Sequence, residues 1–115
     1  MEGQPKEIRR YVKPDGGVPF SEWVDSLRDR KARAKINKRI RQVSVGNLGD
    51  YKSVGEGVCE FRINFGPGYR IYFGQIGSII ILLLWCGDKS TQEKDIKKAI
   101  EYWRDYNARS ENADE

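Results

Sequence analysis

The 115-residue chain contains no histidine, one methionine and two cysteines. Without histidine it cannot form Ser–His–Asp or Cys–His catalytic sets or the common zinc-ligand sets, so acid–base chemistry is left to Lys, Arg, Tyr, Asp and Glu. Cys59 and Cys86 are far apart, form no CxxC pair and lie in apolar, strand-like segments. We therefore expect buried, reduced thiols, with no metal site and no cofactor.

Long apolar runs are also missing. The longest, residues 79–85, is far shorter than the roughly 20 residues that a membrane-spanning helix needs. The first residues, MEGQPKEIRRYV, lack the apolar core of a signal peptide. We therefore expect a cytoplasmic protein with no membrane partner. The length, with 33% charged and 38% hydrophobic residues, predicts a single domain over residues 1–115.

Hydrophobic spacing predicts an α+β order of elements. A short strand at 8–12 ends in a turn at 14–17. Helices follow from Phe20 and from a cap at Asp29, joined closely enough to suggest an antiparallel helical hairpin. Strands are expected at 58–65, 69–73 and 79–85, the last apolar on both faces and therefore central. A capping box of Ser90 and Glu93 opens the last helix, and residues 107–115 are expected to fray.

The segment from 58 to 73 reads as a β-hairpin with a three-residue turn at 66–68. That turn pairs Ile63 with Ile71 and Phe61 with Phe73 against the core. On the other face it pairs Arg62 with Tyr72 and Asn64 with Arg70. Two arginines and a tyrosine then project from one surface, which is either a solvated face with a cation–π contact or a platform that binds phosphate.

Positive charge is concentrated in residues 28–41, which hold eight basic residues and one acid, whereas the whole chain has a net charge of +4 and a pI of about 9.1. Such a run is either a solvated helix face or a surface that binds the backbone phosphates of a polyanion. We expect RNA binding through Arg30, Lys31, Lys35, Lys38 and Arg41. Lys89, just before a helix N-terminus, is a further candidate phosphate contact.

Several segments, in order, carry a resemblance to a known family: PFSEW at 19–23, GNLGDYK at 46–52, EFRI at 60–63, GPGYRIYF at 66–73 and GDKSTQ at 87–92. They resemble the RelE/ParE toxin superfamily and, within it, the HigB-like addiction-module killer proteins, from about Ile8 to Tyr106. The resemblance implies a RelE-like fold, a twisted antiparallel sheet with an N-terminal helical hairpin and a C-terminal helix. It also implies the toxin of a type II toxin–antitoxin module, inhibited by a cognate antitoxin that we expect to be a helix-turn-helix protein.

RelE-type toxins cut mRNA on the ribosome without a metal, using the 2′-hydroxyl of the RNA as nucleophile. By motif position, the resemblance assigns the catalytic surface to Lys52, Arg62, Arg70, Lys89 and Tyr72. Our hypothesis is that Arg62 and Arg70 hold the phosphate while Lys52 or Lys89 transfers protons. Some relatives have a histidine in this site and this chain has none, so the resemblance does not identify the group that protonates the leaving oxygen.

Two alternatives stay open at this point. A ParE-like toxin would inhibit DNA gyrase by binding alone, and a third type of module would bind RNA or an antitoxin without any activity. The clustering of Arg62, Arg70, Tyr72 and Lys89 favours the nuclease, because a gyrase inhibitor does not need these side chains to converge.

Overall fold

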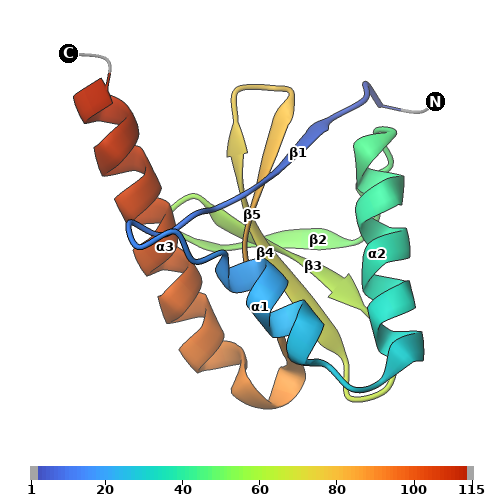
Figure 1. Ribbon diagram of the computed structural model, residues 1–115. Coiled ribbons are helices and arrows are strands. Elements are labelled where there is room, and N and C mark those ends of the chain that lie inside the picture. Colours follow the sequence, from blue (N-terminus) through green and yellow to red (C-terminus); the bar gives the residue numbers. More distant parts are fainter. Residues whose placement is uncertain (1–2, 114–115) are drawn as a thin grey trace.

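The computed structural model describes residues 3–113, with side chains described as far as residue 111. Its strands are β1 (Glu7–Arg10), β2 (Tyr51–Gly55), β3 (Val58–Ile63), β4 (Tyr69–Ile76) and β5 (Ile80–Asp88). Its helices are α1 (Pro19–Ser26), α2 (Arg30–Ser44) and α3 (Gln92–Ala113), and a short 3₁₀ turn, η1 (Lys89–Thr91), precedes α3. The strands form one sheet in the order β1-β5-β4-β3-β2 (Figure 1).

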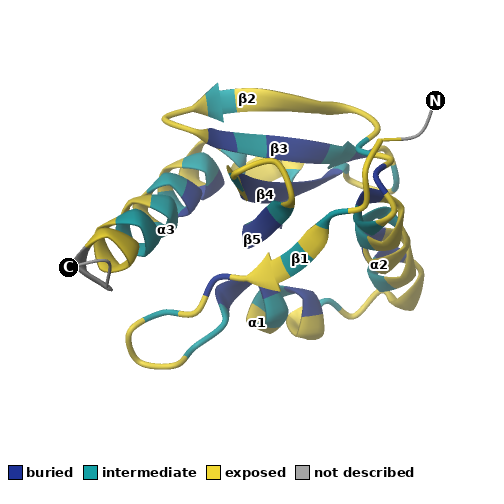
Figure 2. Cartoon of the chain, turned by 90° about the horizontal axis from the view of Figure 1, so that it is seen from above, coloured by how far each residue is buried: buried dark blue, intermediate teal, exposed yellow. Residues whose placement is uncertain are grey.

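The sheet separates two hydrophobic clusters, because successive side chains of a strand point to opposite faces. On one face, α1 and α2 cover a cluster that includes Phe20, Ile36 and Phe61. On the other face, α3 covers a cluster that includes Val58 and Leu84. Figure 2 shows that the three central strands are largely buried, whereas β1 and β2, at the two edges, are mostly exposed. Most of the apolar run at 79–85 lies in β5, a largely buried interior strand, but the middle strand of the five is β4, and Ile79 is exposed outside β5.

The expected fold, an antiparallel sheet with an N-terminal helical hairpin, is wrong. The described chain starts with a strand, β1, which is the one predicted at 8–12 and which pairs in parallel with β5, so the sheet is mixed. The two short helices do not form a hairpin: α1 packs mainly against β5, and α2 against β1 and β3 (Figure 1). The physical reason is that the apolar face of each helix is buried against the sheet and not against the other helix.

The register of the β3–β4 hairpin differs from the expected one by two residues. Arg62 lies opposite Arg70 and Glu60 opposite Tyr72, so the connection spans residues 64–68. The amide of Phe65 donates to the carbonyl of Ile63 at 3.0 Å, and this tight turn takes Asn64 off the ladder. A shift of two keeps every side chain on its predicted face, because the side-chain period of a strand is also two.

The last helix begins later and ends later than expected. The carboxylate of Asp88, not the hydroxyl of Ser90, accepts the capping hydrogen bond at 2.8 Å, and η1 intervenes before α3. Helix α3 continues to Ala113 through the segment expected to fray, supported by an Arg109–Asp105 ion pair at 2.8 Å; residues 114–115 lie outside the described part. Among residues 3–113, no helix combines the length and apolarity that spanning a bilayer requires.

Candidate active site

The centre of the candidate site is Glu60, a carboxylate whose side chain is 0% exposed. It lies on β3, on the α3 side of the sheet, opposite Lys52 of β2 and Tyr72 of β4. The side chain of Gln92, at the start of α3, donates from Nε2 to both carboxylate oxygens, at 3.2 and 3.1 Å. Three strands and one helix therefore fix a single carboxylate.

Three cations converge on one oxygen of this carboxylate. Oε1 of Glu60 lies 3.4 Å from Nε of Arg62, 3.9 Å from Nε of Arg70 and 3.9 Å from Nζ of Lys52. The cations differ in exposure: the side chains of Lys52, Arg62 and Arg70 are 51%, 33% and 10% exposed. The cluster keeps an excess of positive charge. Lys52 and Arg62 are open to solvent while Arg70 lies largely buried behind them, and one ammonium with two guanidiniums is a set that suits a phosphate diester.

Tyr72 lies on the same face but is fully buried. Burial, together with the negative charges of Glu60 and Asp95, raises the pKa of its phenol well above the ordinary value. Two buried donors of the cluster, the Tyr72 hydroxyl and Nε of Arg70, have no hydrogen-bond partner among the described residues. Buried donors without partners are rare in folded proteins. Tyr72 is thus part of the cluster but out of reach of a substrate.

Lys89 lies beside Arg70 at the end of β5. The amide of Lys89 donates to the carbonyl of Gly68 at 2.7 Å, which ties η1 to the hairpin loop. Gly68 has a φ of 83°, and a Cβ there would lie 3.5 Å from Nη1 of Arg70 and 3.7 Å from Cβ of Lys89. Both residues line a depression of about 300 Å³ beside the loop. The structure therefore brings three predicted catalytic cations, Lys52, Arg62 and Arg70, together around Glu60, and Lys89 shares a depression with Arg70.

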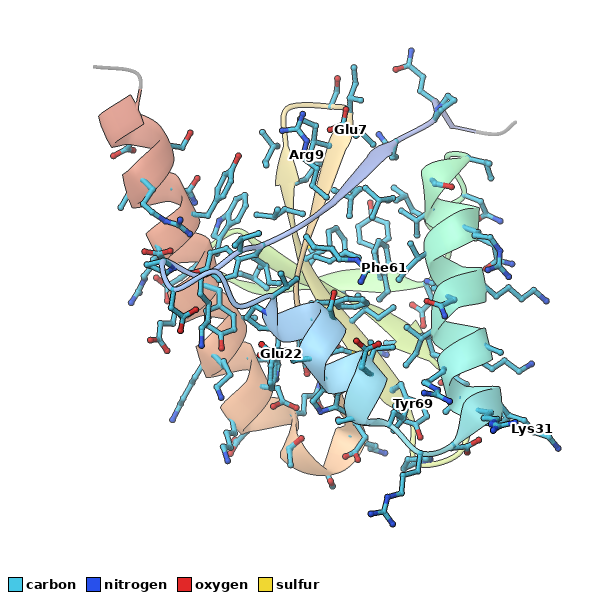
Figure 3. All side chains as sticks on the ribbon, viewed as in Figure 1. Glu7, Arg9, Glu22, Lys31, Phe61 and Tyr69 are labelled. Carbon is cyan, nitrogen blue, oxygen red and sulfur yellow. The ribbon has the colours of Figure 1, made fainter. Side chains whose placement is uncertain are left out.

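The basic residues of α2 divide into two groups. Lys35 and Lys38 line a second depression, of about 240 Å³, together with Arg62. Arg30, Lys31 and Arg41 are exposed but do not line it; Lys31 extends into solvent at the N-terminal end of the helix (Figure 3). Only Lys35 and Lys38 of the predicted RNA-binding set therefore share a depression with one of the predicted catalytic cations, Arg62.

Arg39, also on α2, has a structural role, although it belongs to the basic segment 28–41 that was expected to bind a polyanion. Its Nη2 donates to the carbonyls of Leu48 and Asp50 at 2.9 and 2.6 Å, and its Nη1 to the carbonyl of Arg62 at 3.2 Å. The guanidinium lies over the ring of Phe61, 5.4 Å from its centroid, and burial lowers its pKa. Arg39 thus holds the loop before β2 and the backbone of Arg62 in place.

The start of α3 is held by a second buried carboxylate, Asp95. It accepts hydrogen bonds from the indole of Trp85 at 2.9 Å and from the hydroxyl of Thr91 at 2.6 Å. Gly87 leaves the space for it, because a Cβ there would clash with the carboxylate of Asp95. These contacts fix Gln92 and therefore Glu60.

Sequence reasoning missed Glu60 and Gln92. Alternation along 58–65 placed Glu60 on the polar face with Arg62, where a lone acid beside basic residues reads as ordinary surface. The signal that could have revealed it is its position two residues before Arg62, on the same predicted face as Arg62, Arg70 and Tyr72. Within the described residues, no three Cys, Asp or Glu side chains gather in a way that could hold a metal ion.

No model of a known protein family matches the chain. It is similar to an uncharacterized protein of Haemophilus influenzae, at 49% identity over 82 residues, which cover 71% of this chain and 83% of that protein. Identity at that level over most of both chains shows common descent. The chain belongs to the same family as this Haemophilus influenzae protein.

Proposed function

We propose that the protein is the toxin of a type II toxin–antitoxin module and that it cleaves mRNA on the ribosome without a metal. The observation that carries the proposal is the convergence of Lys52, Arg62 and Arg70 on one oxygen of the buried Glu60. Such a cluster offers preorganised positive charge, which is the main requirement for stabilising a phosphorane-like transition state. The chain's resemblance to HigB-like toxins supports the same reaction.

In the proposed reaction, the 2′-hydroxyl of one nucleotide loses its proton and attacks the adjacent phosphorus. The bond from phosphorus to the 5′-oxygen of the next nucleotide breaks, and that oxygen takes a proton. The products are a 2′,3′-cyclic phosphate and a 5′-hydroxyl, so atoms and charge balance without a further reactant. Arg62 and Arg70 bind the non-bridging oxygens, since a guanidinium offers a planar pair of donors.

Lysines carry the protons in this scheme. Lys52 is about half exposed and adjoins both arginines through Glu60, so it can reach a substrate that they hold. In this scheme the leaving oxygen takes its proton from Lys89, which lines the same depression as Arg70. Glu60 is a positioning residue: it is 0% exposed and touches no substrate, but it aligns the three cations.

The proposed function implies three partners, which are mRNA, the ribosome and an antitoxin. The proposed substrate is mRNA bound to the ribosome. Because translation takes place in the cytoplasm, we expect the protein to act there. An antitoxin, expected to be a helix-turn-helix protein, would cover the cations of the site with an acidic or apolar segment, as electrostatic complementarity favours.

The test is primer extension on a defined mRNA, incubated with the purified protein with and without translating ribosomes. We expect discrete cuts that need the ribosome and that disappear with the double variant Arg62→Ala/Arg70→Ala. The matched control is Arg9→Ala/Arg104→Ala, which removes two exposed arginines, at 52% and 67% exposure, outside the cluster. Because Arg70 is buried, Arg62→Lys/Arg70→Lys serves as a second variant that keeps the charge, and circular dichroism checks folding. Equal cutting by a folded double variant, or no cutting by the wild type, contradicts the proposal.

A further inference from the structure

Two depressions of the surface share one lining residue, Asn64. The first, between α2 and the end of β3, has a volume of about 240 Å³ and is lined in part by Lys35, Lys38 and Arg62. The second, between the hairpin loop and the end of β5, has a volume of about 300 Å³ and is lined in part by Arg70 and Lys89. Asn64 belongs to the lining of both. It therefore stands at the junction of two basic hollows.

The amide of Asn64 is available for a ligand. The residue is exposed, and the turn from Ile63 to Phe65 takes it off the strand ladder. Within residues 3–113, no hydrogen bond engages its side chain. Its φ is not positive, since Glu56 is the one non-glycine residue of the described chain with a positive φ. Substitution of Asn64 therefore introduces no backbone strain.

The two site arginines place the RNA relative to this junction. Arg62 lines the first depression and Arg70 the second, and the two residues are direct cross-strand partners. A phosphate held by both lies between the depressions, so the nucleotides on its two sides enter one depression each. In such a binding mode Lys35 and Lys38 in one depression and Lys89 in the other would meet the neighbouring phosphates, and the base next to the reacting phosphate would adjoin Asn64.

Most of this surface cannot read sequence. Lysine and arginine contacts to phosphate set affinity and position but carry no base information. An asparagine side chain presents a donor and an acceptor side by side, and unstacked RNA bases present matching edges to such groups. We propose that Asn64 binds the edge of a base next to the cleaved bond and so sets the sequence preference of the reaction. This inference rests on the proposed function and goes beyond it by assigning specificity to one residue.

The test measures preference separately from activity. Four ribosome-bound mRNAs that differ in one base at the preferred cut position are incubated with the wild-type protein, with Asn64→Ala and with Asn64→Gln. The control variant Asn37→Ala removes an equally exposed amide, on α2, that lines neither depression. We expect the ratio between the best and the worst base to fall by about tenfold with Asn64→Ala, the factor that corresponds to 1.4 kcal/mol.

The outcomes separate the inference from the function on which it rests. If Asn64→Ala still cuts but has lost most of the base preference while Asn37→Ala keeps it, the inference holds. If both Asn64 variants cut with the wild-type ranking of bases, the inference is overturned and the proposed function stands. If the wild-type protein cuts none of the four mRNAs, the proposed function fails and the inference with it.

Discussion

Arg62 and Arg70 lie directly opposite each other on β3 and β4, and Nε of each approaches the same carboxylate oxygen of Glu60. Like charges in a cross-strand pair normally destabilise a sheet. Here the buried carboxylate between them offsets the repulsion, so the sheet holds two guanidiniums side by side. The consequence is that both the alignment of the cations and the stability of this corner depend on one glutamate.

Glu60→Gln keeps the shape of the side chain but removes the charge that three cations share. We expect the free energy of unfolding to fall by about 2–4 kcal/mol, which is less than the roughly 3–5 kcal/mol for removing one partner of a fully buried ion pair, because Lys52 and Arg62 are partly exposed. Cleavage should fall by about tenfold or more, because the cations lose their alignment. RNA affinity at low salt should not fall, since the site becomes more positive. Urea denaturation, primer extension and filter binding measure the three quantities.

Glu56→Gln is the matched control for that change. The carboxylate of Glu56 is 53% exposed and pairs with Arg104 at the surface, so its loss should change stability by no more than about 0.5 kcal/mol. A Glu60→Gln protein with wild-type stability and wild-type cleavage would show that the carboxylate does not organise the site.

The division of the basic helix α2 predicts a difference in salt dependence. Lys35→Ala/Lys38→Ala should weaken the binding of single-stranded RNA and lower the slope of log affinity against log salt by about 1.4, at about 0.7 for each cation. Fluorescence anisotropy over a salt series measures the slope. The control Lys94→Ala/Lys97→Ala removes two exposed lysines of α3 outside the depressions. An equal loss of slope in the control would mean that the charge is diffuse and that α2 has no special part.

Arg39 should behave as a structural residue although it belongs to the basic run. Arg39→Ala removes the donors to three backbone carbonyls, and we expect the free energy of unfolding to fall by about 2–4 kcal/mol. Arg39→Lys should rescue little, because an ammonium cannot reproduce the planar fork. Chemical denaturation compares both variants with Arg41→Ala. Because Arg41 is exposed, that substitution should lower the free energy of unfolding by no more than about 0.5 kcal/mol. A small effect of Arg39→Ala would refute this assignment.

Alkaline pH should destabilise the fold through Tyr11. Burial, with a 2.6 Å hydrogen bond from its hydroxyl to Asp105, raises the pKa of Tyr11 from 10.0 to about 12. The folded state therefore keeps this proton at a pH where the unfolded state releases it. The stabilisation is fully present below pH 10 and is lost as the pH rises from about 10 to 12. Melting temperatures of Tyr11→Phe across this range should fall less steeply than those of the wild type, and parallel curves would contradict the prediction.

The local elements of the fold follow from local patterns, whereas their long-range pairing does not. The N-cap at Asp29 is confirmed, because its carboxylate accepts from the amides of Lys31 and Ala32. The parallel pairing of β1 with β5 joins residues more than seventy positions apart. Because β1 is a mostly exposed strand of four residues, its sequence pattern does not indicate which strand it pairs with. That pairing is what makes the sheet mixed.

The sequence predicted the cations of the candidate site but not Glu60, the buried acid that aligns them. The alternation of the hairpin put Arg62, Arg70 and Tyr72 on one face, and this parity survived the register error. The same pattern could not tell that Tyr72 and Glu60 would be fully buried, because their burial depends on α3, whose packing over this face is a tertiary contact. Gln92 reaches Glu60 for the same reason.

The most direct test of the central claim, that this cluster cleaves RNA through the RNA's own 2′-hydroxyl, uses one modified nucleotide. A ribosome-bound mRNA carrying a single 2′-deoxynucleotide on the 5′ side of the preferred cut is compared with the unmodified mRNA, with the wild-type protein and primer extension as the readout. The account predicts that the cut at this position disappears while cuts elsewhere persist, and that the unmodified product ends in a 2′,3′-cyclic phosphate. Undiminished cutting at the deoxynucleotide would contradict the account, because the nucleophile would then come from elsewhere.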